Sequence, residues 1–346
     1  MVAPDLGKLH RDKLALWLLV LVLLAAALFI SLVVGVAIGS TNISPGTVFG
    51  VFTGSVTDKT IVSIVMDIRL PRVVLGAVVG AALAIAGVAM QGVFRNPMAS
   101  PSILGISAGA AFGASLAIVL GLSVLSGSFA VPIMSFIFCL GTMLLVYGIS
   151  RTGGIVPVET LLLAGIAVGS LFAALVSFMQ YVAGEKLASI VIWLMGGLGG
   201  ASWNQVLIAT PLVIAGSLLM SLYARDLNLM TIGEEHASSL GVDTQKVILV
   251  LMVATSVVVA AAVSFSGIIG FVGLIIPHMI RMMVGPDHRI LMPASILAGA
   301  SFMIVTDAFA RVVMAPAELP VGIVTAMLGA PFFLYLLRRR RHMMGW

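Results

Sequence analysis

Ser107 stands in the one stretch of the sequence that matches a catalytic motif, Gly105-Ile-Ser-Ala-Gly109. In the G-x-S-x-G motif the serine is a nucleophile on a strand-to-helix turn, and a histidine and an acid elsewhere in the fold complete the site. The flanks of Ser107 are instead typical of membrane helix, and residues 96–150 carry no charged side chain. We therefore expect no catalytic role for Ser107, and an intramembrane enzyme is the least favoured class of function.

Residues that could hold a metal or a nucleotide are also sparse. The five histidines show no H-E-x-x-H or other paired spacing, which gives no support for a metalloprotease. The single cysteine, Cys139, lies in an apolar run, so neither a disulfide framework nor a thiolate metal site is expected. The sequence contains no G-x-x-x-x-G-K-[ST] phosphate loop. We expect a protein that is not an enzyme, needs no cofactor or metal, and does not hold ATP by itself.

Charged side chains gather instead in a polar segment, residues 225–243. The runs on either side, 187–224 and 247–280, carry none. Because charges are costly in hydrocarbon, this segment must lie in water between two membrane-buried segments.

The polar segment also has the signals of a short helix. Thr231 followed by Glu234 fits a capping box, and Gly241 is placed to end the helix. These signals predict a helix over about residues 232–240. Its hydrophobic strip is expected to consist of Ile232, Ala237 and Leu240. Such a helix is marginal alone in water, so we expect something to pack against it, although an ordinary capped loop helix fits equally well.

The elements around this segment are those of a polytopic membrane protein. The chain is 61% hydrophobic and 9% charged. A spanning helix needs about 20 apolar residues, so the composition suffices for about ten. Ten spans fit windows 14–57, 73–94, 96–150 (two, with a turn at 121–128), 160–184, 203–222, 244–284 (two), 290–312 and 319–337. We expect one all-α transmembrane domain over residues 1–346, with a half-length helix within 188–201.

The orientation follows from the lysines and arginines. Residues 14–38 form too long a run for a signal peptide and lack a clear cleavage site, so we expect a retained first helix. With that end in the cytoplasm, most of the 18 basic residues fall inside, which agrees with the positive-inside rule. Those outside are Lys59, Arg69, Arg72, Lys186 and Arg311. We expect a multi-pass protein of the cytoplasmic (inner) membrane with both termini and the polar segment in the cytoplasm, and no nucleic-acid partner.

Glycines recur at the spacing typical of close helix packing. The G-x-x-x-G pairs are Gly76/Gly80, Gly105/Gly109, Gly109/Gly113 and Gly165/Gly169. We expect them to pack helices within one bundle. The glycine-rich run 266–281 fits either close packing or the irregular wall of a transport pathway.

Taken together, these motifs closely resemble the FecCD/BtuC-like permease family of type II ABC importers, which takes up iron-siderophores, haem and cobalamin. The matching stretches lie in order between about residues 42 and 337. They are Arg69-Leu-Pro-Arg72, Gln91-Gly-Val-Phe-Arg-Asn-Pro97, Leu104-Gly105, Leu161-Leu-Leu-Ala-Gly165, Trp193-Leu-Met-Gly-Gly197, Leu240-Gly241, Gly270-Phe-Val-Gly-Leu-Ile-Ile-Pro-His278 and Glu318-Leu-Pro-Val-Gly-Ile-Val-Thr-Ala326. The resemblance implies ten transmembrane helices, a second permease subunit (a homodimer), two cytoplasmic ABC ATPases and an extracytoplasmic substrate-binding protein.

The resemblance also implies roles for particular residues. By this resemblance the polar segment would couple the permease to the ATPases. The coupling residues would be Thr231, Gly233, Glu234, Glu235, Ala237, Leu240 and Gly241. Residues that dock the binding protein would be Arg69, Arg72 and Arg311, although Arg69 and Arg72 also fit membrane-interface anchors. The cytoplasmic gate would be formed by Asn96, Met98, Val158 and Glu159.

Glu159 departs from the family pattern, which has small polar residues there. An acid at the start of a helix is favoured by the helix dipole, so Glu159 fits a helix-end role. Alternatively, two copies of Glu159 would face each other across the inner mouth and repel when ionised.

The sequence is compatible with two classes of substrate. One is a metal chelate (iron-siderophore, haem or cobalamin), and the other is a molybdate- or tungstate-type oxyanion. No cation falls in the middle of an expected span, which mildly favours the chelate. A stand-alone channel or ion-coupled carrier is the alternative class. A carrier would usually place an acid at the midplane, whereas Asp307 and Glu159 lie near span ends.

Overall fold

The computed structural model describes residues 6–39, 43–122 and 129–344. Within these ranges the regular elements are helices, apart from one isolated bridge between Thr152 and Ile155. The expected all-α class is therefore confirmed. Its physical reason is that backbone in hydrocarbon must satisfy its own hydrogen bonds, which a helix does within one segment.

Seven helical stretches in the described chain are long and apolar enough to cross a membrane. The helices concerned are α1 (Leu6–Ala37), α4 (Leu70–Val93), α7 (Ala130–Ser150), α8 (Val158–Val182), α10 (Trp203–Leu222), α13 (Thr244–Ser266) and α15 (His288–Val312). The short helices α3 (Lys59–Ser63) and η1 (Ile64–Arg69) run directly into α4.

Three further apolar helices are shorter. They are α5 (Ile106–Leu120), α14 (Val272–Val284) and the apolar part, Val321–Tyr335, of α16 (Val321–Met344). At 1.5 Å per residue, a helix of 13 or 15 residues reaches only about 20–22 Å, short of the roughly 30 Å of a bilayer core. By length alone there are thus seven full crossings, and a count of ten depends on these three helices. Most of the turn expected at 121–128 lies outside the described residues.

The remaining elements are brief. They are α2 (Pro45–Phe52), η2 (Pro101–Leu104), η3 (Gly184–Lys186), α9 (Leu187–Met195), α11 (Ala224–Met230) and α12 (Glu234–Ser239). Helix α9 is the half-length helix expected within 188–201. Just beyond its end, Gly197 N donates to Ser266 O at 2.7 Å, and Gly322 N donates to Gly196 O at 3.3 Å. The end of α9 is therefore fixed between the end of α13 and the start of α16.

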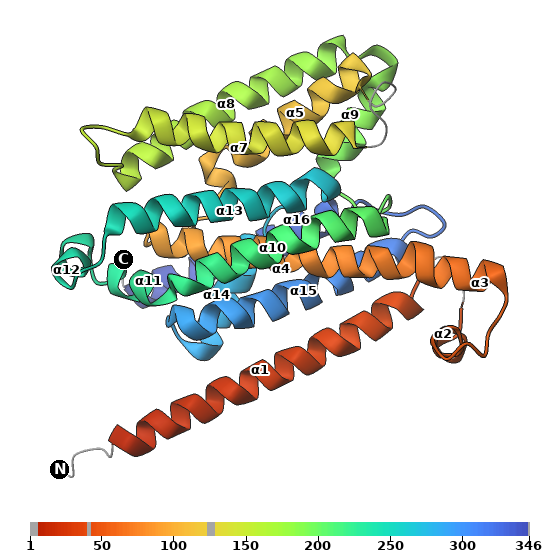
Figure 1. The fold of residues 1–346 in the computed structure, drawn as a ribbon, viewed down its shortest axis with the longest axis horizontal. Coiled ribbons are helices and arrows are strands. Elements are labelled where there is room, and N and C mark those ends of the chain that lie inside the picture. Colours follow the sequence, from red (N-terminus) through yellow and green to blue (C-terminus); the bar gives the residue numbers. More distant parts are fainter. Residues whose placement is uncertain (1–5, 40–42, 123–128, 345–346) are drawn as a thin grey trace.

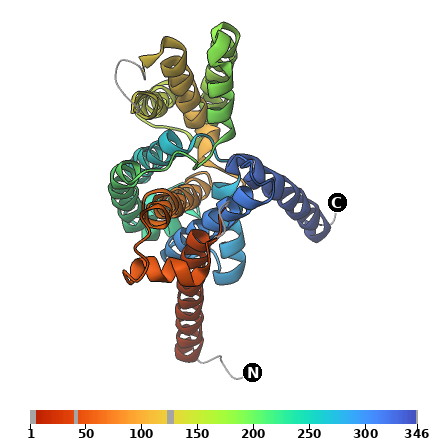
Figure 2. The same cartoon turned by 90° about the vertical axis from the view of Figure 1, so that its right-hand side faces the viewer.

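The helices form layers (Figure 1). Helices α5, α7 and α8 pack together on one side, and α4, α10, α13, α14 and α15 form the central group. Helix α1 lies on the opposite side, against α15. Viewed end-on, α16 leaves the central group sideways (Figure 2).

Helix α4 is the core of the bundle, and nearly every residue from Val79 to Val93 is buried. Its glycines permit this. A Cβ on Gly80 would collide with the backbone of Gly299 on α15, and one on Gly87 would collide with the backbone of Gly273 on α14. The expectation that G-x-x-x-G pairs pack helices within one bundle is confirmed at Gly80.

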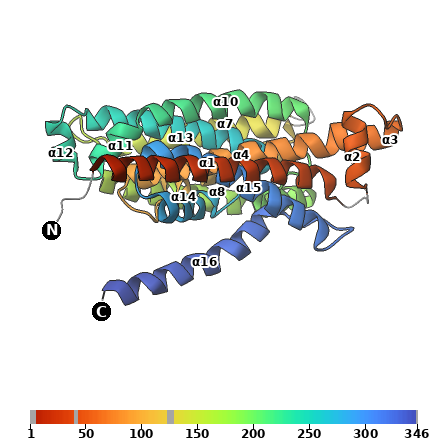
Figure 3. The same cartoon turned by 90° about the horizontal axis from the view of Figure 1, so that it is seen from below.

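The two ends of the bundle differ. The start of α1, the α11–α12 segment and the end of α16 lie toward one end, and α2 and α3 lie toward the other (Figures 1 and 3). Figure 3 also shows α16 diverging from the other helices. Its exposed apolar side chains include Met327, Leu328, Leu334 and Tyr335. Helix α16 therefore presents an apolar surface away from the rest of the chain.

Candidate functional site

The polar segment folds as two short helices: α12, which matches the helix predicted over about residues 232–240, and α11, which was not predicted. The predicted capping box is wrong. The Thr231 hydroxyl donates back to Asn228 O at 2.6 Å and so closes α11, while α12 begins after Gly233 at a φ of 139°. The Glu234 carboxylate accepts from Arg95 at 2.9 Å, a charge-assisted bond, rather than from a backbone amide. Gly241, at a φ of 87°, follows the end of α12 as predicted.

The predicted hydrophobic strip is divided between two surroundings. Ile232 and Leu240 are 67% and 65% exposed, whereas Ala237 is fully buried in the main hydrophobic core. Ala237 therefore packs within the chain, and the coupling role of the predicted set stays a prediction. Residues 237 and 240 would share a face of a continuous helix, but α12 ends at Ser239, so Leu240 lies beyond it where the chain leaves the helix. Thr231, Glu235 and Gly241 are exposed, and Gly233 and Glu234 are half-buried.

The polar segment is anchored to α15 through Asn228. Its side-chain oxygen accepts from the backbone N of His288 at 2.8 Å, and its Nδ2 donates to Asp287 at 2.8 Å. The Arg289 guanidinium, with a further bond from Asn228, holds the pKa of the Asp287 carboxyl below its usual range. A Cβ on Gly92 would lie 2.8 Å from Leu227 and 2.9 Å from His288, so α4, α11 and α15 meet here. These contacts make the base of the polar segment part of the bundle.

The first predicted gate stretch lies at the corner that follows α4. Arg95 has a φ of 49°, a left-handed conformation that turns the chain out of the helix. The Asn96 side chain then accepts from Met98 N at 2.9 Å, which closes a turn before Pro101. Asn96 is exposed and Met98 half-buried. Pro97 and Pro101, four residues apart, keep a helix from continuing through this irregular corner.

The second predicted gate stretch begins α8. Val156 N donates to Gln245 at 2.8 Å, which ties the loop before α8 to the start of α13. Val158 is buried, whereas Glu159 is exposed in the first turn of the helix. The two gate stretches are joined through η2, because Gly105 packs against Gly165 and Gly169 of α8. Among the described residues, Asn96 and Met98 are hydrogen-bonded to each other, and no hydrogen bond joins either of them to Val158 or Glu159.

Glu159→Gln tests the helix-end role of this acid, which its exposure in the first turn supports. The substitution removes the favourable charge–dipole interaction of about 0.3–1 kcal/mol, so we expect a small loss of stability. For a permease of the family that the motifs resemble, uptake per ATP hydrolysed should equal that of the parent at pH 6 and at pH 8. A fall in this ratio at either pH would instead place Glu159 in the gate.

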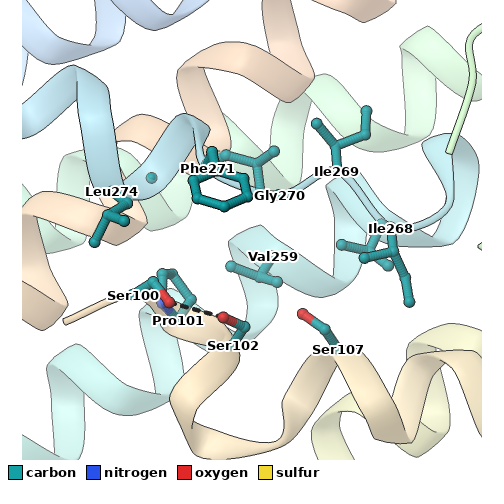
Figure 4. A pocket seen from close by; sticks show the side chains of 13 residues that line it. Ser100, Pro101, Ser102, Ser107, Val259, Ile268, Ile269, Gly270, Phe271 and Leu274 are labelled. Carbon is teal, nitrogen blue, oxygen red and sulfur yellow. Dashed lines mark hydrogen bonds between the residues drawn. The ribbon is translucent and has the colours of Figure 1, made fainter. Parts of the chain in front are cut away.

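A cavity of about 270 Å³ lies between the start of α5 and the break that separates α13 from α14 (Figure 4). Its polar side chains are Ser100, Ser102 and Ser107, and the Ser100 and Ser102 hydroxyls lie 2.7 Å apart. Facing them is the non-helical stretch 267–270 with Phe271. The glycine-rich run 266–281 thus supplies both close packing, at Gly273, and an irregular cavity wall.

The geometry around Ser107 does not support a nucleophile. The residues that line the cavity are otherwise apolar or glycine, with no acid or histidine among them. The element before Ser107 is the 3-10 helix η2, not a strand. A nucleophile elbow requires both features that this site lacks.

At the opposite end of the bundle, the three predicted docking arginines are buried. Arg69, Arg72 and Arg311 are 5%, 8% and 3% exposed. The three side chains are therefore buried within the chain, rather than exposed as the membrane-interface anchors that Arg69 and Arg72 also fitted. Burial is possible because an acid, Asp307, lies between two of the arginines: Arg72 is 3.0 Å and Arg311 3.1 Å from its carboxylate. Arg72 also contacts Glu318 at 2.7 Å.

The arginines also cap the end of α1. Arg69 donates to Val36 O and Ala37 O at 3.0 and 2.8 Å, and Arg311 donates to Gly35 O and Ile38 O at 2.9 and 2.8 Å. The last carbonyls of a helix lack intrahelical partners and favour cations, so these bonds satisfy groups that would otherwise be costly to bury. Docking by these arginines stays a prediction, and it now requires a partner's acid to compete with Asp307 or Glu318 for Arg72.

Asp307 and Glu318 are the functional candidates that the sequence analysis missed. The available signal was the spacing of Asp307 and Arg311, four residues apart in an apolar helix, where an ionisable side chain requires a partner.

Comparison with known proteins agrees with this architecture. The profile of the FecCD transport family matches residues 21–339. The cobalamin import system permease protein BtuC of Halobacterium salinarum is 50% identical over 277 residues, covering 80% of this chain and 74% of that protein. The hemin transport system permease protein HmuU of Yersinia pestis is 41% identical over 314 residues, covering 90% and 94%. Other relatives are named for import of molybdate and of ferric citrate.

A solved structure shares the fold. It is described as an inward-facing conformation of an ABC transporter assigned to the metal-chelate type. Its TM-score is 0.83 at 36% identity, covering 92% of this chain and 98% of that one.

Proposed function

The chain belongs to the FecCD transport family of ABC importer permeases, and from that premise we propose that it forms the membrane pathway of an ATP-driven importer for a metal chelate. A multi-pass permease of this kind is a transport subunit rather than an enzyme. Energy must then come from separate subunits. We assign these as two cytoplasmic ABC ATPases, which work with a second copy of this chain and an extracytoplasmic substrate-binding protein. The membrane is proposed to be the cytoplasmic (inner) one, with both termini on the ATPase side.

The observation that carries this proposal is the pair of exposed hydrophobic side chains, Ile232 and Leu240, on a charged segment at one end of an apolar bundle. A contiguous apolar patch in water marks a binding surface, and we propose that Ile232 and Leu240 belong to one. The base of the segment is held by Asn228 and Leu227, so a force applied at Leu240 would reach α4 and α15.

Pull-down of the detergent-solubilised protein tests the proposal. We expect the ATPase subunits to co-purify with the parent. A stand-alone channel or an ion-coupled carrier would purify without them.

The second permease subunit is expected to cover apolar surface that the single chain exposes. Helix α16 leaves the bundle with an apolar face, and α8 exposes Leu163, Ile166, Leu171 and Phe178. The inner gate is proposed at Asn96, Met98 and Val158, beside the loop that Gln245 holds.

The serine-lined cavity supports a chelate as substrate. Its wall offers hydroxyls and apolar groups without an ionisable side chain, which suits a ligand whose charge is enclosed better than a bare oxyanion. The names of relatives also support the second candidate, a molybdate-type oxyanion. Purification of the binding protein and identification of its bound ligand separates the two, because the cargo would be an organic metal chelate in one case and an inorganic anion in the other.

Ser107→Phe is expected to block the cavity. The added ring would overfill the space between α5 and the 267–270 stretch, at a cost of about 1–3 kcal/mol. We expect uptake to fall by roughly tenfold, corresponding to about 1.4 kcal/mol, while ATP hydrolysis continues. The control is Ser221→Phe, which adds the same ring at an exposed position of α10. Equal uptake by both variants would exclude the cavity from the pathway.

A further inference from the structure

We infer that the ion pair between Arg95 and Glu234 links the gate corner to the ATPase-facing helix, so that both residues are positioning residues for coupling. This inference rests on the proposed function. Arg95 Nη2 lies 2.9 Å from Glu234 Oε1, and 139 residues separate the two in sequence. Arg95 directly precedes the Asn96–Met98 turn, and Glu234 is the first residue of α12.

The location of Arg95 makes the pair effective as a link. The left-handed conformation of Arg95 ends the buried helix α4 and directs the chain into the corner. Only five residues later, Ser100 lines the cavity, followed by Pro101 and Ser102. A displacement of α12 that carries Glu234 with it would therefore pull on the segment that forms one cavity wall.

The location of Glu234 makes it suitable as the other end of this link. Glu234 is the first residue of α12, so the position of its side chain is tied to that helix. Among the ion pairs of the described chain, this is the one that joins the α4 corner to the polar segment. At its other end α4 is held by Arg72, which contacts Asp307 and Glu318. Helix α4 thus has an ion-pair contact at each end.

The pair is poorly placed to serve folding. The Arg95 and Glu234 side chains are 38% and 31% exposed, and partly exposed ion pairs contribute little to stability. The polar segment is already attached by Asn228 to His288 and by Leu227 against Gly92. Loss of the pair should therefore leave the permease folded, which allows coupling to be measured separately from stability.

A charge exchange tests the inference. The complete transporter, with its ATPases, is reconstituted in proteoliposomes, and uptake per ATP hydrolysed is measured for Arg95→Glu, Glu234→Arg and the exchanged double variant. Each single variant should fold and hydrolyse ATP but import about fivefold less per ATP, corresponding to about 1 kcal/mol. The double variant should recover most of the loss, and Arg95→Lys should behave like the parent.

Matched controls are available on the same chain. Arg11→Glu and Asp12→Arg reverse single charges at exposed positions outside the polar segment and should leave the ratio unchanged. If a charge reversal prevents folding, the neutral variants Arg95→Gln and Glu234→Gln provide the same comparison.

The inference is overturned if the single variants keep the parent's uptake per ATP, or if the assembled double variant recovers nothing. A parent complex that shows no ATP-dependent uptake would instead overturn the proposed function, so the two failures are distinguishable.

Discussion

Replacing Asp307 with alanine is expected to destabilise the permease by about 3–5 kcal/mol, the usual range for removing one partner of a buried ion pair. The carboxylate is 3% exposed and is the shared partner of Arg72 and Arg311. Without it, two buried guanidinium groups would lie close together with only Glu318 and backbone carbonyls as partners. We expect a lower midpoint of thermal unfolding in detergent.

The matched control is Glu185→Ala, which removes an acid at an exposed position. Its unfolding midpoint should stay near that of the parent, because single exposed charges contribute little. Combining Asp307→Leu with Arg311→Met should cost less than the sum of the two single changes, since residues in one ion-pair network couple. Additive losses, or a stable Asp307→Ala variant, would contradict the network.

Leu240→Asp is expected to abolish import by preventing productive contact with the ATPases. Leu240 is 65% exposed on the polar segment, so an aspartate there meets no buried surface in the chain itself. In an assembled interface the same charge would be desolvated without a partner, which commonly costs several kcal/mol. We expect the permease to fold normally while the ATPases fail to bind or hydrolyse ATP without uptake.

Two comparisons isolate this effect. Thr152→Asp adds an equal charge at an exposed position of another loop and should leave import intact. Ala237→Asp places the charge in the core and should destabilise the permease itself, before any partner is involved. Full coupling in Leu240→Asp would mean that this side chain faces water or lipid in the complex.

The hydrophobic runs of the sequence were sufficient to predict the fold class and the order of the long helices. Their limits are visible at α5 and α14, which are shorter than a bilayer crossing. Charge-free windows define where a segment is buried but not how long its helix is. The helix break at 267–270 and the end of α9 depend on contacts between segments far apart in sequence.

The candidate site was less predictable for the same reason. Arg72 and Asp307 are 235 residues apart, so no local pattern shows that the arginine is buried against an acid. At the polar segment, Thr231 could end one helix or begin the next. Because the Thr231 hydroxyl bonds to Asn228 O and Glu234 pairs with Arg95, Thr231 ends α11 rather than beginning α12.

Uptake by proteoliposomes measures the central claim most directly. Vesicles that contain the permease alone should show no accumulation of the chelate carried by the binding protein. Vesicles that also contain the ATPase subunits, with ATP and the loaded binding protein supplied on their respective sides, should accumulate it. Equal uptake by the permease alone, without ATPase subunits or ATP, would contradict the account.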